Sequence, residues 1–125
     1  MTKVLFLCIA LVALCSTSSA QNIQNTVWKS YFAAPINDTA TLVIGNDSIT
    51  ISNSQGMTVV KSTIHVNNDT ILINDVGGGV MCPSDEQGVY SYKMTSNKLA
   101  LHIITDPCDG RANSISDREW LRKEN

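Results

Sequence analysis

The chain has 125 residues, of which 43% are hydrophobic and 16% are charged, and its formal net charge is −2. This composition suits one domain with a small hydrophobic core. The absence of a basic excess excludes the electrostatic surface that nucleic-acid-binding proteins need, and an anionic membrane surface would not attract the chain.

The first twenty residues have the pattern of a secretory signal peptide. Lys3 precedes an apolar run from Val4 to Leu14, and small residues lie at Ser18 and Ala20, just before Gln21. A positive start, a short apolar run and small residues before a cleavage site define such peptides. The run is too short to span a bilayer about 30 Å thick as a helix.

We therefore expect a signal peptide over residues 1–20, cleaved between Ala20 and Gln21, and a mature domain over residues 21–125. A bacterial lipid anchor on Cys15 is not favoured, because the bulky Leu14 occupies the position before it. The protein is expected to be secreted or periplasmic, with no membrane span after removal of the signal.

The cysteines indicate a crosslink. Cys8 and Cys15 lie in the expected signal peptide, which leaves Cys82 and Cys108 in the mature domain. An even pair in an exported chain predicts a disulfide. The alternative, a catalytic thiol, would need a neighbouring base and a protected setting.

The mature domain shows period-two alternation of apolar and polar residues, with many β-branched and aromatic side chains, which predicts strands. Asn and Asp pairs between the segments favour tight turns. Two segments near the cysteines, 83–87 and 110–116, are candidates for a helical turn. The predicted strands are 27–32, 39–44, 47–53, 57–66, 69–74, 88–94, 98–105 and 118–123.

Eight short strands in one domain predict an all-β fold, an antiparallel barrel or sandwich. The chain also resembles the lipocalin-like (calycin) family of small exported β-barrels. Trp28 in "NTVWKS" stands in the first strand, and arginines stand in the last, "REWLRK". The resemblance implies an up-and-down barrel in which Trp28 packs at the closed end under Arg122 or Arg118. The family's usual glycine is replaced by Thr26.

Members of this family often hold an apolar molecule inside the barrel. The resemblance therefore makes the inward-facing residues of the predicted strands 88–94 and 98–105 candidates for ligand contacts. Tyr90 and Tyr92 share one face with Met94, and Leu101 and Ile103 share another with Leu99. In a barrel with a cavity, we expect Tyr90, Tyr92, Leu101 and Ile103 to contact the ligand. In a narrow barrel the same side chains would form a solid core.

The chain offers no set of residues typical of catalysis or metal binding. His65 and His102 alternate with apolar neighbours, which predicts solvent exposure, and two scattered histidines do not make a zinc site. No nucleophile elbow is present. The glycines of "DVGGGVMCP" lack the lysine and helix of a phosphate loop and favour a bend instead. We expect neither a cofactor nor enzymatic activity.

Charged residues surround both cysteines. The acidic ones include Asp75, Asp85, Glu86, Asp106 and Asp109, and a disulfide would bring them together, so a calcium site is an open alternative. Arg111 next to Asp109 suggests a local salt bridge, or a buried arginine that holds loop carbonyls. Asparagines that begin N-x-[ST] glycosylation acceptors are Asn37, Asn46 and Asn68.

Together these patterns predict an exported, non-enzymatic β-barrel that binds a small apolar ligand. The alternative is a protein-interaction or inhibitor module, which would present a loop beside the Cys82–Cys108 crosslink to a protein partner.

Overall fold

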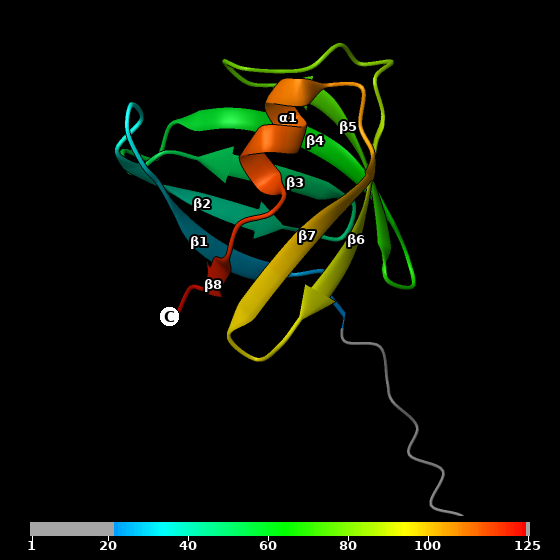
Figure 1. Cartoon of the computed structure of the whole chain (residues 1–125), viewed down its shortest axis with the longest axis horizontal. Helices are drawn as coiled ribbons and strands as arrows, with labels where there is room; N and C mark the ends of the chain where they lie inside the picture. Colours follow the sequence, from blue (N-terminus) through cyan, green and yellow to red (C-terminus); the bar gives the residue numbers. More distant parts are fainter. Residues whose placement is uncertain (1–21, 125) are drawn as a thin grey trace, which may run out of the picture.

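The computed structural model describes residues 22–124, so the expected signal peptide and its cleavage site at Ala20 and Gln21 lie outside the described residues. The described chain forms a closed antiparallel barrel of eight strands, which confirms the predicted fold class (Figure 1). The strands are β1 (Thr26–Phe32), β2 (Asp38–Ile44), β3 (Ser48–Ser52), β4 (Thr58–Asn67), β5 (Thr70–Gly77), β6 (Gly88–Met94), β7 (Lys98–Thr105) and β8 (Trp120–Arg122).

Each strand pairs with its neighbours in chain order, and the short β8 closes the barrel by pairing with both β7 and β1. Closure removes the exposed strand edges that an open sheet would present. A single helix, α1 (Asp109–Ile115), lies between β7 and β8 within residues 22–124. The predicted helical turn at 83–87 is only a tight turn, in which Glu86 N–H donates to the Pro83 carbonyl at 3.0 Å.

The alternating strand directions place the connections at two ends of the barrel. The tight turns at 45–47, 68–69 and 95–97 lie at one end, which we call the closed end. The longer segments 33–37, 53–57 and 78–87 lie at the other, the open end, where α1 also packs (Figure 1). All three glycosylation-type asparagines, Asn37, Asn46 and Asn68, are exposed in turns.

The interior of the barrel contains large aromatic side chains. Trp28, Tyr90 and Trp120 are fully buried. The Arg122 guanidinium carbon lies 4.5 Å from the centre of the Trp28 ring, and the two residues pair across β8 and β1. Arg118 lies instead 3.5 Å from the centre of the Phe32 ring. The arginine that covers Trp28 is therefore Arg122.

The Thr26 side chain makes two hydrogen bonds near the start of β1. Its hydroxyl accepts a hydrogen bond from the Trp28 indole Nε1–H at 2.8 Å and donates to the Ile23 carbonyl. Both Thr26 and Trp28 are buried, and a buried indole N–H needs an acceptor. Thr26 thus satisfies a donor and an acceptor that no water reaches.

No helix within residues 22–124 has the length and apolar character needed to cross a membrane.

We predict that Thr26→Val, which keeps the β-branched shape and removes the hydroxyl, lowers the free energy of unfolding by about 1–3 kcal/mol. The loss arises because the Trp28 N–H and the Ile23 carbonyl stay buried without their partner. Urea unfolding followed by tryptophan fluorescence measures the effect. Thr26→Ser is the matched control and should retain most of the stability; equal stability of the valine variant and wild type would contradict the assignment.

Candidate functional site: an apolar cavity at the open end

A cavity of about 480 Å³ lies between β2–β5 and α1. Its deep wall consists of buried aliphatic side chains from β2, β3, β5 and β7. They are Leu42, Ile49, Ile51, Ile73 and Leu101. Aliphatic side chains dominate this wall because alternate residues of each strand point into the barrel. The surface that a ligand would meet inside the barrel is therefore mainly apolar.

The cavity reaches the surface of the protein through an apolar rim. Ile36 from the β1–β2 connection is 62% exposed, and Val80 and Met81 from the β5–β6 connection are 70% and 45% exposed. All three line the cavity. Large apolar side chains that are exposed together at a cavity are typical of a binding site.

Helix α1 forms the wall opposite the strands. Ile115 is buried in the core and also lines the cavity, together with Gly110 and Ser114. A helix of seven residues is not stable by itself in water. Its position therefore depends on tertiary contacts, of which two stand out: a disulfide at its N-terminal end and a buried arginine in its first turn.

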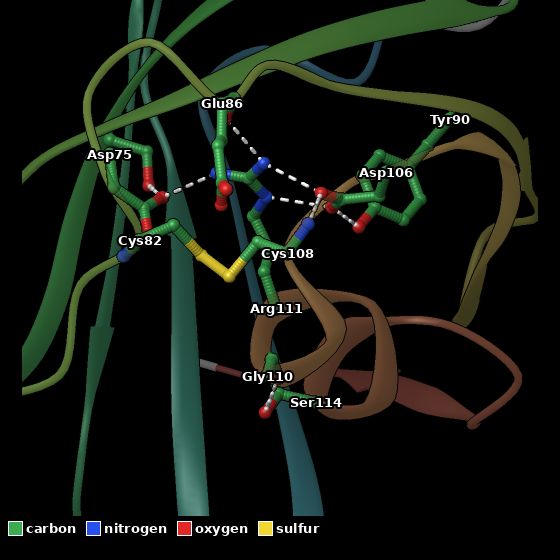
Figure 2. Close-up of a disulfide and its surroundings, with 10 residues drawn as sticks. Asp75, Cys82, Glu86, Tyr90, Asp106, Cys108, Gly110, Arg111 and Ser114 are labelled. Carbon is green, nitrogen blue, oxygen red and sulfur yellow. Dashed lines mark hydrogen bonds and ion pairs between the residues drawn. A yellow bond between two sulfur atoms is a disulfide. The ribbon is translucent and has the colours of Figure 1, made fainter.

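The predicted disulfide between Cys82 and Cys108 is present and tethers α1 to the β5–β6 connection (Figure 2). It closes a loop across 26 residues of sequence separation, worth about 3.5 kcal/mol in the chain-entropy model. Both cysteines line the cavity. The crosslink therefore holds together two walls of the same site.

Arg111 is the centre of a buried charge cluster beside the disulfide (Figure 2). Its side chain is 5% exposed. Nε and Nη2 donate to the two oxygens of Asp106, both at 2.8 Å, which is the bidentate geometry of a strong pair. Nη1 donates to Asp75 Oδ1 at 3.2 Å, and Nη2 also donates to the Glu86 carbonyl at 2.7 Å.

The two carboxylates have further donors. Asp75 accepts from the Ser62 hydroxyl and from the Cys82 N–H, each at 2.8 Å. Asp106 accepts from the Tyr90 hydroxyl and from the Cys108 N–H. Burial of these charges is tolerated because each is paired and hydrogen-bonded. The cluster thereby links β5, the ends of β6 and β7, and α1.

These contacts shift the pKa values of the cluster. Burial alone would raise the pKa of Asp106, but hydrogen bonds from Arg111, Tyr90 and the Cys108 N–H hold it below its ordinary value. Burial, together with the bond to Asp106, raises the pKa of the Tyr90 hydroxyl far above its ordinary value. Tyr90 is thus a protonated donor and Asp106 an ionised acceptor at neutral pH.

The β5–β6 connection is also held by its backbone. Val80 N–H donates to the Val59 carbonyl at 3.0 Å. Gly78 has a φ of 105°, and a Cβ there would lie 2.5 Å from the Val59 carbonyl oxygen. Only glycine fits this approach without strain. The glycine run therefore acts as the expected bend and fixes Val80 and Met81 at the cavity rim.

Of the four residues that the sequence predicts to contact a ligand, one lines the cavity and three do not. Leu101 lines the cavity. Tyr90 and Tyr92 lie in the core and do not line it; their hydroxyls donate to Asp106 and to the Asn68 carbonyl. Ile103 pairs with the buried Tyr90 across β7 and β6, but it is 43% exposed and does not line the cavity. The register of this pairing shifts only beyond Ile103, where Val89 pairs with Thr105.

The sequence prediction missed most of the cavity. Its deep wall comes chiefly from β2 to β5, whose alternating isoleucines and leucine were visible but did not distinguish core from cavity. Arg111 pairs with Asp106 and Asp75, not with the adjacent Asp109, which is exposed. The alternative of a buried arginine that holds a loop carbonyl is what the structure contains.

His65 and His102 are exposed, as the alternation predicts. Within residues 22–124, no group of three or more His, Cys, Asp or Glu side chains is arranged to hold a metal ion. Two acidic residues near the cysteines, Asp75 and Asp106, instead surround the chain's own cation, Arg111.

Comparison with known proteins finds no matching family model, no matching curated protein and no matching solved structure.

We predict that Arg111→Met lowers the free energy of unfolding by about 3–5 kcal/mol, because it leaves two carboxylates buried without their cation. Guanidinium chloride unfolding of the oxidised protein measures the change. Arg122→Met, which removes an exposed cation stacked on Trp28, is the control and should cost about 1 kcal/mol or less. Similar losses in the two variants would show that the cluster does not have the stabilising role assigned to it.

The lowered pKa of Asp106 gives a pH dependence. Its stabilising contribution is complete above the ordinary aspartate pKa of about 3.9 and is lost as the pH falls through the lower pKa of the folded state. The free energy of unfolding should therefore fall with decreasing pH below about pH 4. Denaturant titrations across this range should give a shallower fall for Asp106→Asn than for wild type; parallel curves would contradict the assignment.

Proposed function

We propose that this protein is an exported, non-enzymatic β-barrel that binds a small apolar molecule in the open-end cavity. The observation that carries the proposal is the cavity itself, about 480 Å³ in volume and walled by buried leucine and isoleucine side chains. Sites for small molecules have volumes of about 300–1,000 Å³ and mostly apolar walls. An apolar molecule that fills the cavity would remove both its own surface and the cavity wall from water.

The arrangement of the barrel interior supports this proposal. The buried side chains of Trp28, Tyr90 and Trp120 do not line the cavity, and space remains between the strands and α1. A barrel of eight strands is just wide enough either to be filled or to hold one small ligand. These large buried side chains leave the cavity unfilled, so that it retains volume for a guest.

Export is consistent with the crosslink. Disulfides persist in oxidising compartments, and the signal-peptide pattern of residues 1–20 predicts delivery to one. The contact between Trp28 and Arg122 agrees with the proposed lipocalin-like relationship. A binding role is supported over catalysis because the deep charged groups of the cavity wall, Asp75 and Arg111, are bonded to each other.

A second candidate function rests on the exposed residues Val80 and Met81. They are presented on a segment that the disulfide, the Gly78 bend and a backbone bond to Val59 hold in place. A pre-ordered loop with exposed apolar side chains can bind a partner protein at low entropic cost. This observation favours an interaction or inhibitor module as the alternative to ligand binding.

We predict that Ala40→Phe weakens ligand binding. Ala40 lines the cavity, so a phenyl ring there would occupy the space that a guest needs. The probe is N-phenylnaphthylamine, a neutral fluorophore that brightens in apolar sites. Wild type should bind it, and the variant should bind at least about tenfold more weakly, the loss expected when one good apolar contact of about 1.4 kcal/mol is replaced by a clash.

Ala100→Phe is the matched control, because Ala100 lies between the inward-facing Leu99 and Leu101 and does not line the cavity. It should bind the probe as wild type does. Native mass spectrometry of the gently purified wild-type protein gives an independent measurement, since a retained guest adds mass that denaturation releases. An empty protein that does not brighten the probe would reject ligand binding and favour the interaction module.

A further inference from the structure

The charges around the cavity restrict the kind of apolar molecule that it can take, an inference that rests on the proposed ligand-binding function. Three charged side chains line the cavity: Asp38, Asp75 and Arg111. Asp106 does not line the cavity, but it is bonded to Arg111 and adds another negative charge. The cavity and its immediate support therefore hold three carboxylates against one guanidinium.

Among the described residues 22–124, Arg111 is the cation that lines the cavity, and its donors are already bonded to other groups of the protein. Arg111 gives Nε and Nη2 to Asp106, Nη1 to Asp75, and a further Nη2 bond to the Glu86 carbonyl. The Arg111, Asp75 and Asp106 cluster has a net charge of −1, because one positive charge faces two negative ones. A ligand carboxylate beside it would add a like charge in a region of low dielectric and lose its own hydration.

The other deep donors of the lining are also committed to the protein. The Ser62 hydroxyl donates to Asp75, and the Ser114 hydroxyl donates to the Gly110 carbonyl. A buried anion is stable only when cations or several hydrogen-bond donors surround it. The deep wall supplies no such set, so an anionic head group would not be compensated there.

Asp38 places a negative charge at the rim. It begins β2 at the open end, on the same face as Ala40 and Leu42, which lead into the cavity. Hydrogen bonds from Ser54 and the Thr39 N–H lower the pKa of Asp38, so that it is ionised at neutral pH. A ligand whose tail contacts Leu42 would have its polar end near this carboxylate.

The protein surface around the cavity mouth also carries negative charges. Asp85, Glu86 and Asp109 lie on the two segments that the disulfide joins. Of the cations near this end in the described chain, Lys61 is exposed on β4 next to the inward-facing Ser62, and Arg118 stacks on the ring of Phe32. Neither lines the cavity.

We propose that the cavity selects neutral or cationic apolar ligands, with an alkyl or aryl body and a hydroxyl or ammonium group at the Asp38 rim, and discriminates against apolar carboxylates such as fatty acids. The apolar body supplies affinity through burial against the isoleucine and leucine wall. The head group supplies selectivity, because Asp38 can accept a hydrogen bond from a hydroxyl or pair with an ammonium group, whereas it repels a carboxylate.

The test compares decanol, decylamine and decanoate as competitors of N-phenylnaphthylamine with the oxidised wild-type protein. The three compounds share one alkyl chain, and at about pH 7 the amine is cationic and the acid anionic. Decylamine and decanol should displace the probe at concentrations at least about tenfold lower than decanoate, because only decanoate brings a like charge to the carboxylates of the cavity. Added salt should reduce the difference between decanoate and decanol, because it screens the repulsion between decanoate and the solvent-exposed carboxylates.

Asp38→Asn tests the rim directly. It keeps an oxygen acceptor for the local turn and removes the charge, so the affinity for decanoate should rise several-fold and that for decanol should stay unchanged. Asp47→Asn is the matched control, because it removes the same charge from an exposed turn at the closed end. It should change none of the three affinities, and thermal unfolding of both variants checks that the fold is retained.

The possible results separate the selectivity from the function. Decanoate that binds as tightly as decanol would overturn the selectivity and leave apolar ligand binding in place. Failure of all three competitors, with no binding of the probe, would reject the ligand-binding function and the inference with it. Equal effects of Asp38→Asn and Asp47→Asn would overturn the role of Asp38 at the rim.

Discussion

The fixed position of Arg111 is the constraint on which the open end depends. Its guanidinium joins Asp75 in β5, Asp106 after β7 and the Glu86 carbonyl before β6, which are distant in the sequence. A helix of seven residues could not hold a cavity wall by its own stability. The arginine and the adjacent disulfide supply that stability from outside the helix, so a cavity can persist where a simple barrel would collapse onto its own side chains.

This arrangement also explains why charge is tolerated in the barrel. An isolated buried carboxylate would be costly, and a hydrophobic replacement for the whole cluster could be equally stable. The cluster fixes the orientation of α1 more strictly than a hydrophobic contact would, because the planar guanidinium fits two carboxylates and a carbonyl in one orientation only. The position of α1 over the open end is specified in this way, and with it the shape of the cavity.

Local pattern was sufficient for much of the fold. Alternation and turn residues located all eight strands to within a few residues, and two cysteines in an expected exported chain predicted their own crosslink. The charge cluster could not be predicted, because Arg111 and Asp75 are 36 positions apart and meet only when the barrel closes. The adjacent Asp109 was the nearer partner in sequence and the wrong one, since the first turn of α1 points the two side chains to different surroundings.

The predicted ligand contacts also show what the sequence pattern cannot predict. Alternation placed Tyr90, Tyr92, Leu101 and Ile103 on inward faces, but it carries no information about which part of the interior is filled. The tyrosine hydroxyls find acceptors in Asp106 and the Asn68 carbonyl, so those rings became core. Ile103 pairs with the buried Tyr90, yet it is 43% exposed and lies outside the cavity lining. Whether an inward side chain becomes core or cavity wall is decided by distant partners.

The two candidate functions share one end of the barrel, and they differ in how many of its features they explain. An interaction loop would account for the exposed Val80 and Met81, but it would not explain the cavity that these residues line. Both residues, with Ile36, line the mouth of the same cavity whose deep wall is Leu42, Ile73 and Leu101. A ligand that enters between them would cover the exposed apolar rim and fill the interior at once. Ligand binding therefore explains the rim, the cavity and the rigid support of α1 by one requirement, whereas a protein contact explains the rim alone.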